Sequence, residues 1–288
     1  GKDADRQRIF SEADLVVACG LIESDVTTGF FSLGLDAKPV ARLHTGYTQL
    51  GGPSWTDSAV YNGVPIAEVL TAVRHKITGD ADGRRRWWTP PAPLPFAIAS
   101  EDGDLTEEFV FLRLRDFLRA GDVLISETGT SAQNIGGLPV PDNVRYINQT
   151  SWGSIGYALP ALLGSLLSEP GRRHVLCMGD GSFQLTAQEL STIVRQGLAP
   201  VILLLNDVAN WSYHELPRVF GLDNDRLLSR VCCTRSELDA ALAEAADTDR
   251  LAFIEITLQP EDMTAATTTV GDATRVYDYG VTGPTSPF

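Results

Sequence analysis

The stretch that decides the fold is Gly179–Trp211, GDGSFQLTAQELSTIVRQGLAPVILLLNDVANW. An apolar run, His174–Met178, ends at its first glycine, and a second apolar run, Val201–Leu205, ends at Asn206–Asp207. Short apolar runs bounded by turn residues indicate buried strands, and the residues between them have a helical pattern that ends at Gly197. The order strand, helix, strand predicts a right-handed crossover in a parallel sheet, with both turns at the carboxyl edge.

Two acidic side chains, Asp180 and Asp207, are therefore expected to meet at that edge. Mg²⁺ prefers oxygen ligands and is commonly held by one or two carboxylates together with phosphate oxygens. Gly179 and Gly181 allow a phosphate to approach the backbone closely, and Ser182 adds a hydroxyl donor. The pattern predicts a divalent cation that holds a diphosphate, although a Gly-Asp-Gly tripeptide by itself is also compatible with a simple turn.

Capping signals predict two of the helices. Thr186 and Glu189 have the spacing of a capping box, so the helix of the central stretch is expected to begin there. Thr234 and Glu237 have the same spacing and predict a helix over Leu238–Ala246. A final strand is expected directly after that helix, at residues 251–257.

Composition limits the classes of function. The chain has 288 residues, 43% of them hydrophobic and 21% charged, which is ordinary for one large or two smaller globular domains. Its formal charge of -14 argues against nucleic-acid binding. It has neither an apolar run of about 20 residues nor a recognisable signal peptide. The four cysteines fit neither a disulfide framework nor a zinc site, so we expect reduced thiols in a cytoplasmic protein.

The domain organisation follows from a composition break in the first third of the chain. Residues 1–80 contain two strand-like runs, Ala13–Gly20 and Pro39–His44, and a helical pattern over Val60–Ile77. Residues 81–104 contain Trp87, Trp88 and a proline cluster, and are interpreted as a linker. Residues 105–262 are predicted to form the diphosphate- and metal-binding domain. Residues 263–288 are rich in Thr, Gly and Pro, and are expected to be a disordered tail or a lid.

Four segments of the chain resemble a known family. The 24 residues between Gly181 and Asn206 match the spacing of the thiamin-diphosphate motif. Glu127–Ala132 (ETGTSA), Trp152–Gly156 (WGSIG) and Gln188–Thr192 (QELST) extend the likeness. Together they are similar to the pyruvate/indolepyruvate decarboxylases, which use thiamin diphosphate and Mg²⁺ to decarboxylate 2-oxo acids. The resemblance implies an α/β fold with a doubly wound parallel sheet, preceded by a partial Rossmann-like central domain.

The resemblance also implies roles for individual residues. Asp180, Asp207 and the carbonyl of Ala209 would hold the metal. The carbonyl of Gly153 would face the aminopyrimidine of the cofactor, and Ile155 would hold its two rings in a bent shape. The cofactor-binding residues implied in this way are Thr128, Thr130, Gly153, Ile155, Gly179, Asp180, Gly181, Ser182 and Asp207.

After Asp207 the chain departs from the family pattern. An aspartate stands in place of the usual second asparagine, and Ala209 stands about where the family has a glycine. The family has a catalytic glutamate shortly afterwards, and Glu215, two residues late, is its candidate counterpart. His214 beside it is interpreted as a surface histidine.

The family's N-terminal pyrimidine-binding domain has no counterpart in this sequence. In the family a glutamate of that domain promotes ionisation of the cofactor, so we expect the chain alone to be inactive. The chain is interpreted as one subunit of a split lyase whose partner chain carries that domain, as a fragment of a longer polypeptide, or as a non-catalytic scaffold. Carboligation, the formation of an acyloin from two carbonyl compounds, is an alternative to decarboxylation.

Overall fold

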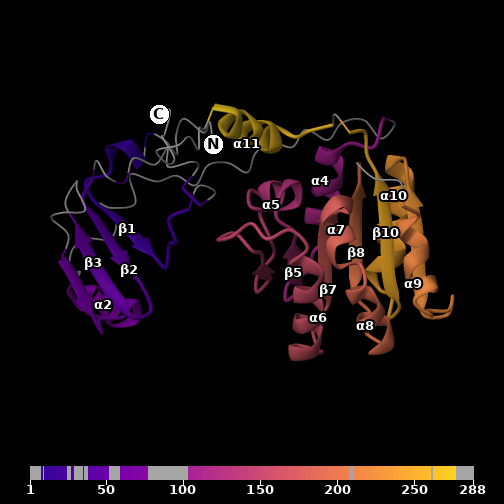
Figure 1. Cartoon of the computed structure of the whole chain (residues 1–288), viewed down its shortest axis with the longest axis horizontal. Coiled ribbons are helices and arrows are strands. Elements are labelled where there is room, and N and C mark those ends of the chain that lie inside the picture. Colours follow the sequence, from indigo (N-terminus) through magenta and orange to yellow (C-terminus); the bar gives the residue numbers. More distant parts are fainter. Residues whose placement is uncertain are drawn as a thin grey trace. The chain divides into compact units, whose positions relative to one another are not determined.

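The computed structural model describes residues 8, 10–24, 27–28, 35, 38–51, 59–76, 103–207, 211–260 and 262–276. The chain divides into two compact units, Gly1–Ala92 with Thr269–Phe288 and Pro93–Thr268, which are described separately (Figure 1). The predicted linker, including Trp87 and Trp88, lies outside the described residues except for its last two positions.

The second unit is built on one six-stranded sheet in the order β6-β5-β7-β8-β10-β9. All five neighbouring pairs are parallel, which confirms the predicted doubly wound α/β fold. The strands are β5 (Val123–Ser126), β6 (Arg145–Ile147), β7 (His174–Gly179), β8 (Val201–Asn206), β9 (Leu227–Cys232) and β10 (Leu251–Thr257).

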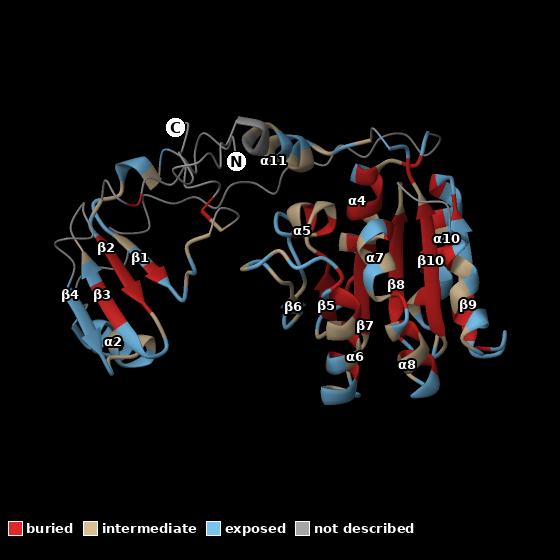
Figure 2. Cartoon of the chain, viewed as in Figure 1, coloured by how far each residue is buried: buried red, intermediate tan, exposed pale blue. Residues whose placement is uncertain are grey.

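Helices cover both faces of this sheet. They are α4 (Glu107–Phe117), α5 (Thr130–Ile135), α6 (Ala158–Ser168), α7 (Asp180–Thr186), α8 (Glu189–Arg195), the 3₁₀ helix η4 (Tyr213–Glu215), α9 (Leu216–Val219) and α10 (Arg235–Ala246). Side chains of successive strand residues point to opposite faces. In β8, Leu203 packs into the core under α4 and α10, whereas Leu204 packs into the core under α6, α7 and α8. Figure 2 shows the buried residues concentrated in these strands and on the facing helix surfaces.

The first unit contains a mixed four-stranded sheet in the order β1-β2-β3-β4. Its elements are β1 (Val16–Cys19), β2 (Val40–Leu43), β3 (Tyr47–Gly51), β4 (Ala59–Asn62) and α2 (Ile66–Lys76). β1 and β2 are parallel, and the other two pairs are antiparallel. The predicted helix over Val60–Ile77 is wrong for its first residues, because they pair with β3, and Pro65 favours a helix start only after the strand has ended.

The capping box predicted at Thr186 is wrong. The helical backbone already begins at Asp180, directly after β7, and α8 starts separately after a turn. The Thr186 hydroxyl donates a hydrogen bond to the carbonyl oxygen of Gly156 at 2.9 Å instead of capping a helix. The second predicted capping box is confirmed, since the side chain of Thr234 and that of Glu237 each accept a hydrogen bond from the other residue's backbone.

Within the segment interpreted as a tail or lid, Ala265–Val276 forms helix α11. Its start is fixed by Thr264, whose N–H donates to Glu107 Oε2 at 2.9 Å and whose hydroxyl donates to Asn134 Oδ1 at 2.6 Å. All four cysteines are free, but only Cys177 and Cys232 are buried. Among the described residues, no helix has both the length and the apolar character needed to cross a bilayer.

Candidate functional site

The strand order of the sheet reverses between β5 and β7, and we use the word crevice for the region outside the carboxyl ends of these two strands. The chain leaves β5 toward β6 at one edge and then returns to β7 on the other side of β5. Ligands of open α/β sheets bind at such a reversal of strand order, outside the carboxyl ends of the strands. The loops that follow the two strands contain Thr128–Thr130 and Gly179–Ser182, which are the segments predicted to contact a diphosphate.

The structure brings Asp180 and Asp207 together at this edge. Asp180 follows β7 and is only 1% exposed, and Asp207 follows the neighbouring strand β8 and is half-buried. Burial raises the pKa of Asp207, and the charge of Asp180 with a hydrogen bond between the two carboxyl groups raises this pKa further. Two acids in such close contact repel each other when both are ionised, and a cation between them would relieve that repulsion.

Asp180 is held by two polar neighbours. The N–H of Gly181 donates to Oδ1 at 2.8 Å, and the hydroxyl of Tyr213 donates to Oδ2 at 3.4 Å. Tyr213 in turn accepts a hydrogen bond from Gln184 Nε2 at 2.7 Å. Side chains of this kind behind a metal ligand fix its orientation.

Space for a phosphate is present beside the glycines. A Cβ atom placed on Gly129, Gly179 or Gly181 would meet no atom within 4 Å. Gly129 has φ +106°, a conformation that favours glycine. Thr130 begins helix α5, while the Thr128 hydroxyl donates to the carbonyl oxygen of Gln149 at 2.9 Å. The residues present therefore fit a diphosphate and its cation.

Glu127 connects this crevice to the following loop. Its Oε1 accepts from the N–H of Thr128 at 2.9 Å, and its Oε2 accepts from the N–H groups of Gly156 and Ala158 at 3.1 Å. Burial raises the pKa of Glu127, whereas these hydrogen bonds lower it. The buried carboxyl group thus fixes the Trp152–Gly156 loop against the end of β5.

The Trp152–Gly156 loop presents apolar side chains to the solvent. Trp152 is 82% exposed and Ile155 is 59% exposed, so neither belongs to the core of this chain. Gly153 has φ +57°, and a Cβ on Gly156 would lie only 3.1 Å from Leu185 and Thr186 of α7. The same Cβ would lie 3.5 Å from the carbonyl oxygen of Ser182, so the loop packs along α7 and reaches the turn that contains Asp180.

The predicted catalytic residue Glu215 lies in a network of charged groups. Its Oε1 is 3.3 Å from both His214 Nε2 and Arg218 Nη1. His214 Nδ1 lies 2.7 Å from Oε2 of the buried Glu255, which also accepts from the His214 backbone N–H at 2.9 Å. His214 is therefore fixed to β10 and is not an unconstrained surface residue. Ala209, the third predicted metal ligand, lies outside the described residues.

Comparisons with known proteins show what this chain is similar to. A family model described as "Thiamine pyrophosphate enzyme, C-terminal TPP binding domain" matches residues 128–210. An alpha-keto-acid decarboxylase of Mycolicibacterium paratuberculosis is 35% identical over 267 residues, covering 86% of this chain and 46% of the relative. A pyruvate decarboxylase of Kluyveromyces lactis is 35% identical over 231 residues, covering 73% of this chain and 40% of the relative.

The chain belongs to the thiamin-diphosphate-dependent 2-oxo acid decarboxylase family. It spans less than half of the length of these two relatives. The matched segment of the family model begins in the loop after β5 and extends beyond Asp207, so it contains both acids, Thr128–Thr130 and Gly179–Ser182.

Some polar residues at the site belong to no sequence motif that would have predicted their position. Glu107, Tyr213 and Glu255 are separated along the sequence and meet the site only through the fold. Glu107 is buried at the start of α4, and burial raises its pKa to about 7, with further contributions from the charges of Asp262 and Asp207. Within the described residues, no group of three or more His, Cys, Asp and Glu side chains could by itself hold a metal ion.

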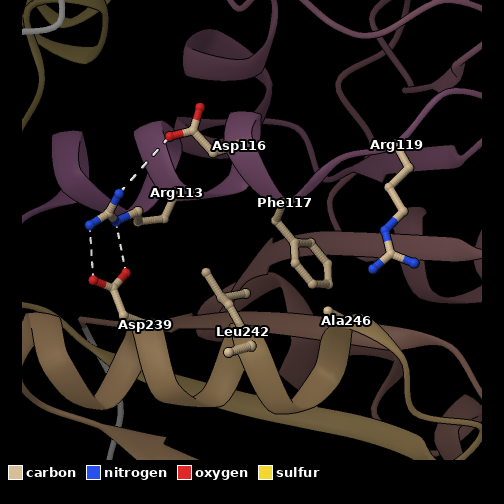
Figure 3. A pocket seen from close by; sticks show the side chains of 8 residues that line it. Arg113, Asp116, Phe117, Arg119, Asp239, Leu242 and Ala246 are labelled. Carbon is tan, nitrogen blue, oxygen red and sulfur yellow. Dashed lines mark hydrogen bonds and ion pairs between the residues drawn. The ribbon is translucent and has the colours of Figure 1, made fainter.

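A shallow pocket of about 370 Å³ lies elsewhere, between α4 and α10 (Figure 3). Arg113 forms a two-pronged ion pair with Asp239 there, with N–O distances of 2.7 and 2.9 Å. Arg119 is paired with Asp247 at 2.9 Å. The pocket extends to Phe117 at the last turn of α4, toward the amino ends of the strands, so it is separate from the region between β5 and β7 that contains Asp180.

Proposed function

We propose that this chain binds thiamin diphosphate and Mg²⁺ for the non-oxidative decarboxylation of a 2-oxo acid. The observation that carries the proposal is the contact between Asp180, which follows β7 beside the reversal of strand order, and Asp207, which follows the neighbouring strand β8. Family membership supports the cofactor, and the two acids with the open space beside Gly179 and Gly181 support the place where its diphosphate would bind.

Different residues of the chain would bind the metal ion and the diphosphate of the cofactor. Asp180 and Asp207 would supply two carboxylate ligands to Mg²⁺, and the remaining positions would be left for phosphate oxygens, the Ala209 carbonyl and water. The hydroxyls of Thr130 and Ser182 would donate to the diphosphate, and that of Thr128 would do so only by giving up its hydrogen bond to the carbonyl oxygen of Gln149. Bound thiamin diphosphate would supply the nucleophilic carbon and the electron sink that decarboxylation requires.

The exposed loop would position the organic part of the cofactor. Ile155 is exposed although it is apolar, and its place beside the Asp180 turn suits a side chain that packs beneath a bound ring system. The carbonyl of Gly153 would face the pyrimidine amino group. Glu215 would hold or transfer a proton on the substrate side, with His214 fixed beside it by Glu255.

A partner chain with a pyrimidine-binding domain would complete the site. Four large apolar side chains are exposed around the crevice: Trp152, Ile155, Leu185 and Trp211. Exposed apolar residues that cluster in this way mark contact surfaces. The greater length of the relatives is consistent with a further domain in the complete enzyme.

Calorimetric titration tests the proposal. We expect thiamin diphosphate with Mg²⁺ to bind the wild-type chain and not Asp180→Asn, whereas Asp116→Asn, which removes an exposed acid of α4, should bind like the wild type. Equal binding by the wild type and Asp180→Asn would refute the cation site.

Analysis of the product formed in the presence of the partner chain then distinguishes decarboxylation, which gives an aldehyde, from carboligation, which gives an acyloin. A stable complex that binds no cofactor would indicate the scaffold role.

A further inference from the structure

Tyr213 is a buried polar residue beneath the proposed cation site. It has no exposed surface, and its ring contacts the aromatic rings of Phe183 and Trp211, with centroid distances of 5.8 and 5.7 Å. The Phe183 ring also packs edge-on against Phe253 of β10. This aromatic cluster fixes the direction in which the phenol of Tyr213 points.

The phenol hydroxyl has two polar neighbours, Gln184 Nε2 at 2.7 Å and Asp180 Oδ2 at 3.4 Å. An amide nitrogen can only donate a hydrogen bond, so the phenol oxygen accepts from Gln184. The single phenol proton is then directed to Asp180, which can accept it. The hydrogen bonds therefore run in one direction, from Gln184 through Tyr213 to the carboxylate.

The opposite oxygen of Asp180 is also held, by the N–H of Gly181 at 2.8 Å. With one donor on each oxygen, the carboxylate plane is fixed even when no cation is bound. Asp180 also shares a hydrogen bond with the carboxyl group of Asp207, and a cation bound between the two acids would take the place of that proton. A ligand that is already oriented loses less conformational entropy when the ion binds.

We propose that Tyr213 is a positioning residue that holds Asp180 in the orientation required for divalent-cation binding. This inference rests on the proposed function, because it assigns a cation to Asp180. It adds a residue that stands two positions before Glu215, about where the family pattern expects a catalytic glutamate. In this chain the residue at that position is Tyr213, which donates a hydrogen bond to the proposed cation ligand Asp180.

Cation affinity of the purified chain tests the proposal without measuring catalysis. We expect Tyr213→Phe to bind Mn²⁺, titrated with thiamin diphosphate and followed by the electron paramagnetic resonance signal of free Mn²⁺, about 10- to 100-fold more weakly than the wild type. Gln184→Met is the matched control: it removes the other hydrogen bond of the phenol but leaves the proton for Asp180, so its affinity should remain close to that of the wild type. Unchanged melting temperatures without metal would show that both variants fold.

The outcomes separate this inference from the proposed function. If the wild type binds Mn²⁺, Asp180→Asn does not, and Tyr213→Phe binds like the wild type, only the role of Tyr213 is overturned. If the wild type and Asp180→Asn behave alike, the cation site and this inference both fail. An equal loss of affinity in Gln184→Met and Tyr213→Phe would also overturn the specific role of Tyr213.

A second variant keeps the test decisive if Tyr213→Phe does not fold. Gln184→Glu retains the phenol but replaces the donor with a carboxylate that accepts the phenol proton, and so withdraws it from Asp180. An added negative charge alone would tighten Mn²⁺ binding. Weaker binding would therefore support the positioning role, and unchanged or tighter binding would overturn it.

Discussion

Replacing Glu107 by Gln is expected to make the free energy of unfolding less dependent on pH. Glu107 is 2% exposed, and its carboxyl group accepts from the N–H of Thr264 at 2.9 Å. The acidic groups that act on it are Asp262 and Asp207, whose charges raise its pKa, and the neutral side chains of Asn134 and Thr267 lie beside it. Burial is the largest cause of the increase in its pKa.

The size of the effect follows from the two pKa values. The pKa of Glu107 rises from an ordinary 4.5 to about 7 in the folded chain. Each pH unit between these values corresponds to about 1.4 kcal/mol, so the total is about 3 kcal/mol. The folded chain holds this proton more tightly, so the contribution to stability is complete below pH 4.5. It decreases as the pH rises and is lost above about pH 7.

Urea unfolding of the metal-free protein between pH 4.5 and 8 measures this contribution. Glutamine has no proton to lose, so the stability of Glu107→Gln relative to the wild type should increase by about 3 kcal/mol over this range. Glu108→Gln, which removes an exposed acid from the same helical turn, should run parallel to the wild type. A constant difference between Glu107→Gln and the wild type at every pH would refute the reasoning.

Three further predictions concern Asp207, Glu127 and the helix cap Thr234. Mg²⁺ affinity should increase with pH, because the raised pKa of Asp207 requires the cation to displace a proton, and calorimetry in buffers of different ionisation enthalpy should detect that proton. Glu127→Gln should cost about 1–3 kcal/mol in urea unfolding, since at least one of the buried N–H groups of Thr128, Gly156 and Ala158 loses its acceptor. Thr234→Ala should cost about 1 kcal/mol in the same assay through loss of the α10 cap.

The centre of the second unit could be predicted from local patterns because its central strands are buried. The runs that form β7, β8 and β10 are mostly apolar, with Glu255 as a buried acid inside β10, and such runs are typical of central parallel strands covered on both faces. β6 and β9 were not predicted. β6 has three residues, of which two are exposed, and two of the six residues of β9 are exposed, so their sequences lack that apolar continuity.

The site could be predicted only where its residues lie close together in sequence. Asp180 and Asp207 each follow a strong strand signal, so topology alone places them at one edge. Tyr213, Glu255 and Glu107 lie on separate elements, and their polar side chains meet the site through tertiary contacts. Tertiary packing also explains the failed capping box, because the hydroxyl of Thr186, the last residue of α7, donates to the Gly156 carbonyl and does not cap α8.

Ionised acids at this edge of the sheet lower the stability of the folded chain when no cation is bound. Asp207 and Glu107 both have raised pKa values, in each case with burial as the largest cause and neighbouring acids as an added one. A protein selected for stability alone would be expected to replace such acids with neutral side chains. A bound divalent cation near Asp180 and Asp207 changes this balance, because it stabilises the ionised form of each acid and binds only the folded chain. The electrostatic cost in the cation-free fold is therefore consistent with a site whose acids are retained for ligand binding.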